Sequence, residues 1–207
     1  SGGSTITMTN SASGAYTLTG GAGVDNITGG TGNDIISGNG GADTIDGGTG
    51  NDIIAGNAGI DIITGGTGND TITGGSDNDT ISGNAGNDII TGGTGNDNLT
   101  GNAGNDTFNV DSGTDTVTDL ATGDNLVVSS GATANATNVS AFVAASGTTN
   151  AGTATLTAVS SGGTIDLTSA GGSTAYTLVS GAGTDTLKGD DANDTFTISA
   201  AGEGNND

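Results

Sequence analysis

Aspartate is the residue type in this chain that is best suited to chemistry. The chain has 207 residues, and its 23 acidic residues are 22 Asp and one Glu, against a single basic residue, Lys188. Histidine and cysteine, which bind most transition metals, are absent. The formal net charge of -22 and the hard oxygen ligands that carry it favour multivalent cations such as Ca²⁺.

Most of these Asp residues recur every nine residues. Residues 20–109 form ten nonapeptides without insertion or deletion, beginning GGAGVDNIT, GGTGNDIIS and GNGGADTID. The sixth position is always Asp, namely Asp25, Asp34, Asp43, Asp52, Asp61, Asp70, Asp79, Asp88, Asp97 and Asp106. The eighth is always apolar, namely Ile27, Ile36, Ile45, Ile54, Ile63, Ile72, Ile81, Ile90, Leu99 and Phe108. Such a short fixed period indicates a solenoid rather than a disordered acidic tail.

The nonapeptides resemble the RTX repeat, GGxGxDxUx, which occurs in bacterial surface-layer proteins, adhesins and proteins of type I secretion. The resemblance implies an all-β fold, a parallel β-roll or β-solenoid with two nonapeptides per coil. Each nonapeptide is then expected to form a turn of six residues and a strand of three. Glycines at positions one, two and four allow the turn geometry and a close backbone approach.

Alternation along each short strand points position eight inward and positions seven and nine outward. Inward side chains one coil apart are eighteen residues apart in sequence, so two apolar stacks are expected. One runs from Ile36 to Phe108 and the other from Ile27 to Leu99. A core this thin needs help from bound metal, and the chain without metal is expected to be disordered.

Stacked coils place the Asp side chains of repeats two apart about 4.8 Å from one another, the spacing of adjacent strands. A cation between them would accept both carboxylates and turn carbonyls, a flexible oxygen set that suits Ca²⁺ better than Mg²⁺. The resemblance pairs Asp25 with Asp43, Asp34 with Asp52, and so on to Asp88 with Asp106, which gives about eight sites. The expected carbonyl ligands include Gly29, Gly30, Gly32, Gly47, Gly48, Gly50, Gly65, Gly66 and Gly68. Asp77 departs from the pattern because it replaces the glycine of position four.

The repeat weakens after residue 109. Residues 110–128 keep its phase at Asp115 and Asp124, which are weaker ligand candidates, and resemble the segment that caps the roll. Residues 135–145 are compatible with one short helix capped by Asn138 or Thr137. The segments ATLTAV, GTIDL and TAYTLV alternate like strands.

A longer period relates the two ends of the chain. The segment from Ala15 matches the segment from Ala175 at an offset of 160, with nine of fifteen residues identical. Asp185 and Asp194 then belong to a second block of repeats and are further ligand candidates. The expected organisation is residues 1–19 as leading strands, 20–109 as the roll, 110–128 as its cap, 129–180 as a β-rich linking subdomain and 181–207 as the start of a second block. With a start at Ser1 instead of Met, we expect a piece of a tandem array.

Composition excludes several classes of function. An acidic surface repels nucleic acid and anionic lipid, and no apolar run is long enough to insert into a membrane. No enzyme is expected, because acid–base and nucleophilic catalysis would lack His, Cys and Arg. The expected partners are calcium ions and copies of the chain or neighbouring modules, at the bacterial cell surface or in the medium. A secretion signal would have to lie outside this sequence.

Three functions remain open. One is a calcium-dependent structural module of a surface layer, filament or adhesin, for which outward Ile35, Ile53 and Ile89 offer a contact stripe. A generic preference of β-branched residues for strands explains that stripe equally well. Another is the non-catalytic secretion or folding module of a type I-secreted enzyme or toxin. Ice or another ligand is the third, suggested by ranks of Thr and Asn at Thr31/Asn33, Thr49/Asn51 and Thr67/Asn69.

Overall fold

The computed structural model describes residue 2, residues 5–7 and residues 14–198. The chain divides into two compact units, residues 1–107 and residues 108–207. The remaining parts of the first and last expected segments, residues 1, 3–4, 8–13 and 199–207, lie outside the described residues. All regular elements of the described residues are β-strands, and no helix among these residues is long and apolar enough to cross a membrane.

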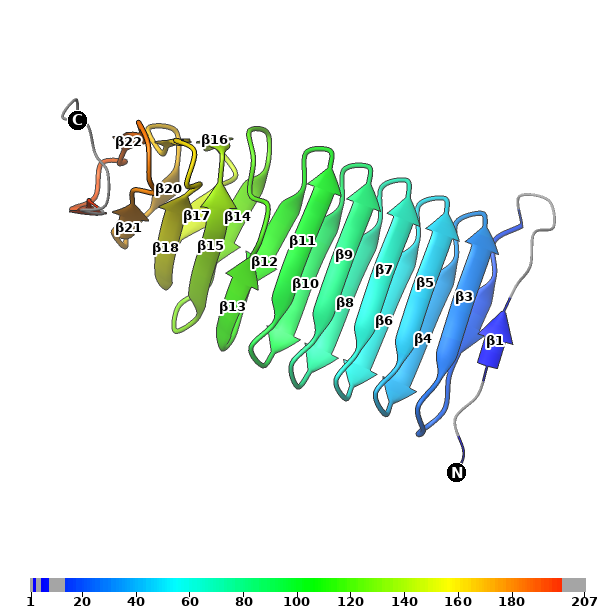
Figure 1. The fold of residues 1–207 in the computed structure, drawn as a ribbon. Coiled ribbons are helices and arrows are strands. Elements are labelled where there is room, and N and C mark those ends of the chain that lie inside the picture. The colour runs from blue at the N-terminus through cyan, green and yellow to red at the C-terminus, as the bar shows by residue number, and fades with distance from the viewer. Residues whose placement is uncertain (1, 3–4, 8–13, 199–207) are drawn as a thin grey trace. The chain divides into compact units, whose positions relative to one another are not determined.

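Unit 1 consists of two parallel sheets between which the chain alternates (Figure 1). One sheet contains, in spatial order, β1 (Thr5–Thr7), β3 (Asn26–Thr31), β5 (Thr44–Thr49), β7 (Ile62–Thr67), β9 (Thr80–Ala85) and β11 (Asn98–Ala103). The other contains β2 (Thr17–Thr19), β4 (Ile35–Gly40), β6 (Ile53–Ala58), β8 (Thr71–Ser76) and β10 (Ile89–Thr94). Two successive strands, one from each sheet, therefore make one coil, as the repeat predicts.

Paired residues in adjacent coils are eighteen residues apart in sequence, so equivalent positions of the repeat lie beside each other. Ile36 lies beside Ile54 in one sheet, and Ile27 lies beside Ile45 in the other. The same register continues to Ile90 and to Leu99. The two predicted isoleucine stacks are thus confirmed within unit 1.

These stacks form the core between the two sheets. All ten residues at position eight are at most 1% exposed. The neighbouring position seven faces outward, and Ile35, Ile53, Ile62 and Ile89 there are each about half exposed. The predicted alternation of side chains is therefore confirmed.

The strands are longer than expected. Each strand from β3 to β11 has six residues instead of three, because pairing continues through positions one to three of the next repeat. The backbone bends within this stretch, since positions two and four take positive φ angles such as 74° at Asn39 and 116° at Gly41. Glycine and asparagine tolerate this left-handed conformation better than other residues. The turn proper is consequently only about three residues long.

Unit 2 continues the parallel pattern with less regular coils. One set of paired strands contains β13 (Thr114–Val117), β15 (Thr133–Val139), β18 (Thr153–Ala158), β21 (Tyr176–Val179) and β23 (Thr195–Thr197). A second contains β12 (Thr107–Val110), β14 (Asn125–Val128), β17 (Thr149–Asn150) and β20 (Gly171–Gly172). A third, small sheet contains β16 (Ala141–Val143), β19 (Thr164–Asp166) and β22 (Thr186–Lys188).

The prediction of a short helix over residues 135–145 was wrong. The chain forms β15 and β16 there, separated by a single residue, Ser140. Ala134, Ala136 and Val139 are buried on β15, and Phe142 is the buried residue of β16. Pairing with β18 and β19 therefore overrides a local sequence that would also suit a helix. The three predicted strands in ATLTAV, GTIDL and TAYTLV correspond to β18, β19 and β21.

Candidate metal centre

The repeated Asp residues form two columns in unit 1. Each of the ten is at most 2% exposed. The first column contains Asp25, Asp43, Asp61, Asp79 and Asp97, and the second contains Asp34, Asp52, Asp70, Asp88 and Asp106. The structure thus brings together the pairs that the repeat predicts.

In nine of the ten Asp residues, one carboxylate oxygen accepts a backbone hydrogen bond from the preceding coil. Oδ1 of Asp43 accepts a hydrogen bond from the backbone N–H of Asp25, with 2.8 Å between nitrogen and oxygen. The same bond recurs at each step of both columns at 2.7–2.9 Å, eight times in all. Oδ1 of Asp34 also accepts from Tyr16, which extends the second column by one coil. These charge-assisted bonds fix the vertical register of the coils.

The other carboxylate oxygen is buried without a hydrogen-bond partner. This holds for Oδ2 of seven Asp residues in unit 1: Asp34, Asp43, Asp52, Asp61, Asp70, Asp79 and Asp88. A buried, unpaired oxygen of a charged group is strongly unfavourable unless a cation or a donor satisfies it. Glycine at position one of the same repeat makes room beside it, since a methyl group on Gly29 would lie 2.6 Å from Oδ2 of Asp34. The columns therefore fit a hard cation at Oδ2.

The first coil behaves differently. Oδ2 of Asp25 accepts the N–H of Gly21 at 2.5 Å, so an amide already satisfies it there. Asp194, near the end of the described residues, likewise accepts the N–H of Asp190 at 2.9 Å. Inside the stack, the corresponding oxygens of the seven Asp residues have no such donor. Asp185 in unit 2 also has a buried Oδ2 without a hydrogen-bond partner, so such oxygens are not confined to the columns of unit 1.

Burial also raises the pKa values of several Asp carboxyls in the columns. Desolvation is the largest cause, and it raises the pKa of Asp61 and Asp70 to about 6 and that of Asp79 to about 7. Negative charges on the neighbouring Asp residues raise these pKa values further, while the backbone hydrogen bond lowers them. The pKa values of Asp43, Asp52 and Asp88 are raised for the same leading reason. Positive charge placed in the columns would reverse this penalty.

Side chains alone do not complete a metal shell. Among the described residues, no group of three or more Asp, Glu, His or Cys side chains is gathered closely enough to hold an ion. An ion in the columns would therefore need further ligands, such as backbone carbonyls. The carbonyl oxygens of Gly30 and Gly32 lie close to Gly48 and Gly50 of the next coil. The carbonyl of Thr49 is already used, since it accepts the N–H of Gly32.

Four further Asp residues were predicted as additional ligand candidates. Asp115 is buried, but its strand neighbour in the following coil is Ala134. Asp124 is buried and its Oδ2 accepts the N–H of Ala121, as in a turn. Asp185 and Asp194 are half-buried, and their Oδ1 atoms accept the N–H groups of Gly163 and Tyr176.

A second ladder was missed by the sequence reasoning. Asn at position five accepts, through Oδ1, the backbone N–H of the Asn one coil later, as in the pair Asn33 and Asn51 at 2.9 Å. The ladder continues through Asn69, Asn87 and Asn105. Asn78 and Asn96, in the seventh and ninth nonapeptides, form the same bond on the other side of the coils. Recurrence of Asn at position five, immediately before Asp, was the available signal.

Asp77 occupies its unusual position without breaking the coil. Its φ is 79°, and glycine also takes a positive φ at eight of the other nine fourth positions. Its charge raises the pKa of Asp61 and of Asp79. Asp77 thus adds negative charge beside the first column.

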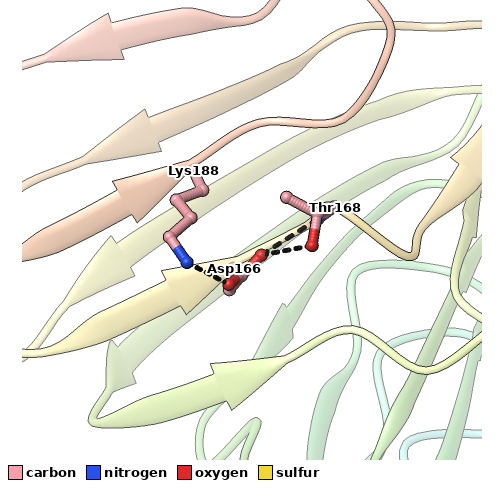
Figure 2. A network of polar contacts seen from close by, with 3 residues as sticks. All are labelled: Asp166, Thr168 and Lys188. Carbon is pink, nitrogen blue, oxygen red and sulfur yellow. Dashed lines mark hydrogen bonds and ion pairs between the residues drawn. The ribbon is translucent and has the colours of Figure 1, made fainter.

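The single basic residue does not neutralise the columns. Lys188 on β22 forms an ion pair with Asp166 on β19 at 2.7 Å, and Thr168 donates to the other oxygen of Asp166 (Figure 2). The hydrogen bond from Lys188, with those from Thr168, lowers the pKa of Asp166 to about 2. Both strands belong to unit 2. Compensation of the columns in unit 1 must therefore come from outside the chain.

Comparison with known families agrees with this geometry. A family model described as the RTX calcium-binding nonapeptide repeat matches the chain in four copies, over residues 19–54, 55–90, 82–117 and 171–197. The first three copies cover the two columns, and the fourth covers Asp185 and Asp194. No curated protein matches the chain. Since the matched residues make up more than half of the sequence, the chain belongs to the family of proteins that carry RTX calcium-binding nonapeptide repeats.

Proposed function

We propose that the chain is an extracellular structural module that folds on binding Ca²⁺ and assembles with copies of itself or with neighbouring modules in a bacterial surface layer, filament or adhesin. The observation that carries the calcium part is the row of seven buried Oδ2 atoms without partners. Calcium is the ion that RTX repeats bind in general. A low-affinity extracellular module binds it with a dissociation constant of about 10⁻⁴–10⁻³ M.

The proposed ligands are the ten Asp residues of the two columns and the glycine carbonyls of the adjoining turns. Each step of a column offers one site, so eight hydrogen-bonded steps correspond to about eight ions. An interior Asp such as Asp61 then belongs to two sites, whereas Asp25 at the end of its column belongs to one. Folding and binding are coupled because the unfolded chain offers no preformed site.

Calcium counting tests this arrangement. Bound ions are measured by equilibrium dialysis for the wild type, for Asp61→Asn and for Asp25→Asn. We expect about eight, six and seven ions, because Asn keeps the Oδ1 acceptor and loses the charged Oδ2. The control is Asp46→Asn, since Asp46 is exposed on β5 and outside the columns. Equal losses for Asp61→Asn and Asp25→Asn would contradict shared sites, and full β-type circular dichroism in excess chelator near neutral pH would contradict calcium-dependent folding.

Two observations bear on the alternatives. The exposed stripe of Ile35, Ile53 and Ile89 on β4, β6 and β10 supports assembly over an isolated stalk or a secretion module. Calcium-induced sheets or fibres in electron micrographs would agree with assembly, and monodisperse rods would favour the secretion module.

The threonines that suggested ice binding do lie in register, from Thr31 to Thr49 to Thr67, but Ala85 and Ala103 follow on the same face. Ice binding would require thermal hysteresis that Thr49→Leu abolishes.

A further inference from the structure

The two sheets of unit 1 differ on their outer faces (Figure 1). Strands β4, β6, β8 and β10 contain no charged residue, whereas β5 in the other sheet carries the exposed Asp46. Three of those four strands begin with an outward isoleucine, but in the other sheet only β7 does so among β3, β5, β7, β9 and β11. A general strand preference would act equally on both sheets, because the same repeat builds both. The outer surface of β4, β6, β8 and β10, the uncharged face, is therefore distinct.

Outward residues of the uncharged face form three rows along the stack, because alternate residues of a strand share a face. The first row is Ile35, Ile53, Thr71 and Ile89. The second row is Ser37, Ala55, Thr73 and Thr91, and the third is Asn39, Asn57, Gly75 and Gly93. All of these residues are exposed or half-buried. Side-chain size thus changes along each row.

Each row fits its own reversed copy. A two-fold axis along the strands, between β6 and β8, would bring every row of one copy against the same row of another in opposite order. In the first row, the isoleucines at the two ends then face each other, and Ile53 faces the smaller Thr71. In the second row Ala55 faces the larger Thr73, and in the third row both asparagines face glycines. Large side chains therefore meet smaller ones at most positions.

We infer that the uncharged face binds the same face of a second copy around this two-fold axis. Charge favours this occupant, because the net charge is -22 with a single basic residue, so two copies repel each other wherever exposed Asp residues approach. The uncharged face avoids that repulsion. An axis along the stack would, at full overlap, lay the isoleucine row over the row of Asn and Gly, so the axis along the strands is the one that brings isoleucines together. The inference deepens the proposed function, on whose calcium-dependent folding and self-assembly it rests.

The area of the uncharged face sets the strength of the contact. Four strands about 4.8 Å apart, each of six residues at about 3.3 Å per residue, cover about 400 Å² on each copy. Interfaces below about 1,200 Å² in total are typical of weak association. Single copies should therefore pair weakly, and chains carrying several such faces would pair more tightly. Because the contact joins identical surfaces, it closes and places two copies side by side instead of in series.

Crosslinking through one engineered cysteine tests the pairing, because the chain has no cysteine of its own. Thr71 lies beside the proposed axis, so the two Thr71 residues of a pair would be about 10 Å apart, the spacing of packed sheets. The full chain carrying Thr71→Cys is treated in Ca²⁺ with a bismaleimide that spans this distance. We expect a covalent dimer, and its loss in chelator. The matched control is Thr80→Cys, at the equivalent exposed position of β9 in the other sheet, which should stay monomeric.

A second pair of variants tests whether the isoleucines hold the contact. Ile53 and Ile62 are each 55% exposed and occupy the same position of the repeat in opposite sheets. In the Thr71→Cys chain, Ile53→Asn should lower the dimer yield about tenfold or more, because a two-fold contact loses the apolar side chain twice. Ile62→Asn should leave the yield unchanged.

The outcomes separate the pairing from the proposed function. Equal dimer yields from Thr71→Cys and Thr80→Cys, or equal losses from the two Asn variants, would overturn the pairing and leave calcium-dependent folding intact. Only monomers from Thr71→Cys, while circular dichroism shows the folded roll, would do the same. Absence of β signal in Ca²⁺ in the wild type would overturn the proposed function and the pairing together.

Discussion

Lowering the pH should allow the roll to fold without calcium. The pKa values of Asp61 and Asp70 are about 6 and that of Asp79 is about 7 in the fold, against an ordinary value of 3.8. Because the folded pKa values are higher than the unfolded ones, the fold binds protons more tightly. The calcium-free fold is therefore most stable below about pH 4 and loses stability as the pH rises to about 7.

The size of this effect follows from the three shifts. One pKa unit corresponds to about 1.4 kcal/mol. Together the three carboxyls destabilise the calcium-free fold at about pH 8 by roughly 5–10 kcal/mol, where the lower figure allows for screening by solvent. A domain of this size is usually stable by only about 5–15 kcal/mol, so the effect is large enough to decide whether the roll folds.

The assay is far-ultraviolet circular dichroism in chelator, from about pH 8 down to about pH 5. We expect a coil spectrum at the upper end and a cooperative gain of β signal as the columns take up protons. Asp79→Asn should fold at higher pH than the wild type, since it keeps the acceptor for the N–H of Asp61 and removes the charge. Asp46→Asn, an exposed change, should move the midpoint much less. Identical coil spectra at both ends of the range would refute the reasoning.

The remaining predictions concern the turns and are measured as thermal midpoints in Ca²⁺. Gly65→Ala should destabilise the roll by about 1–3 kcal/mol, because its methyl group would collide with Oδ2 of Asp70 and approach the carbonyl oxygen of Gly83 to 2.9 Å. Gly40→Ala should leave the thermal midpoint nearly unchanged, since the nearest atoms to its added methyl group are 3.9 Å away and the equivalent position in the next coil is already Ala58. An equal loss of stability in Gly65→Ala and Gly40→Ala would show that backbone freedom matters more than the collision. Asp77→Gly should raise the midpoint, because glycine takes a φ of 79° without the strain of about 1–2 kcal/mol. A lower midpoint for Asp77→Gly would mean that the Asp77 carboxylate contributes to binding.

The regular part of the molecule could be predicted from the sequence because each local signal repeats. Ten copies of Asp at position six and of an apolar residue at position eight specify both the eighteen-residue register and the two faces of each strand. Strand length could not be obtained in this way. Pairing of Asn39 with Asn57 and of Gly40 with Ala58 continues the ladder through residues that usually mark a turn.

The less regular coils of unit 2 have no repeated sequence signal of this kind. In residues 133–139, the buried Ala134, Ala136 and Val139 are small or widely spaced, so the alternation typical of a strand is weak. Their pairing with Ala154, Leu156 and Ala158 is a contact between segments about twenty residues apart. A single short segment read alone does not reveal such a partner, and residues 135–145 therefore suggested a helix.

The two ladders of the roll explain why Asp is needed at position six. The Asn ladder and the Asp columns both use a side-chain Oδ1 atom to accept a backbone N–H one coil away, but in opposite directions along the stack. Hydrogen bonding alone would thus be served by neutral Asn at either position. The Asn side chains are exposed, whereas the Asp side chains are buried beside a glycine that makes room for a second, charged oxygen. That charged oxygen destabilises the fold until a proton or a cation neutralises it. The same carboxylates that fix the register of the coils therefore also present the oxygens that the proposed calcium ions would bind.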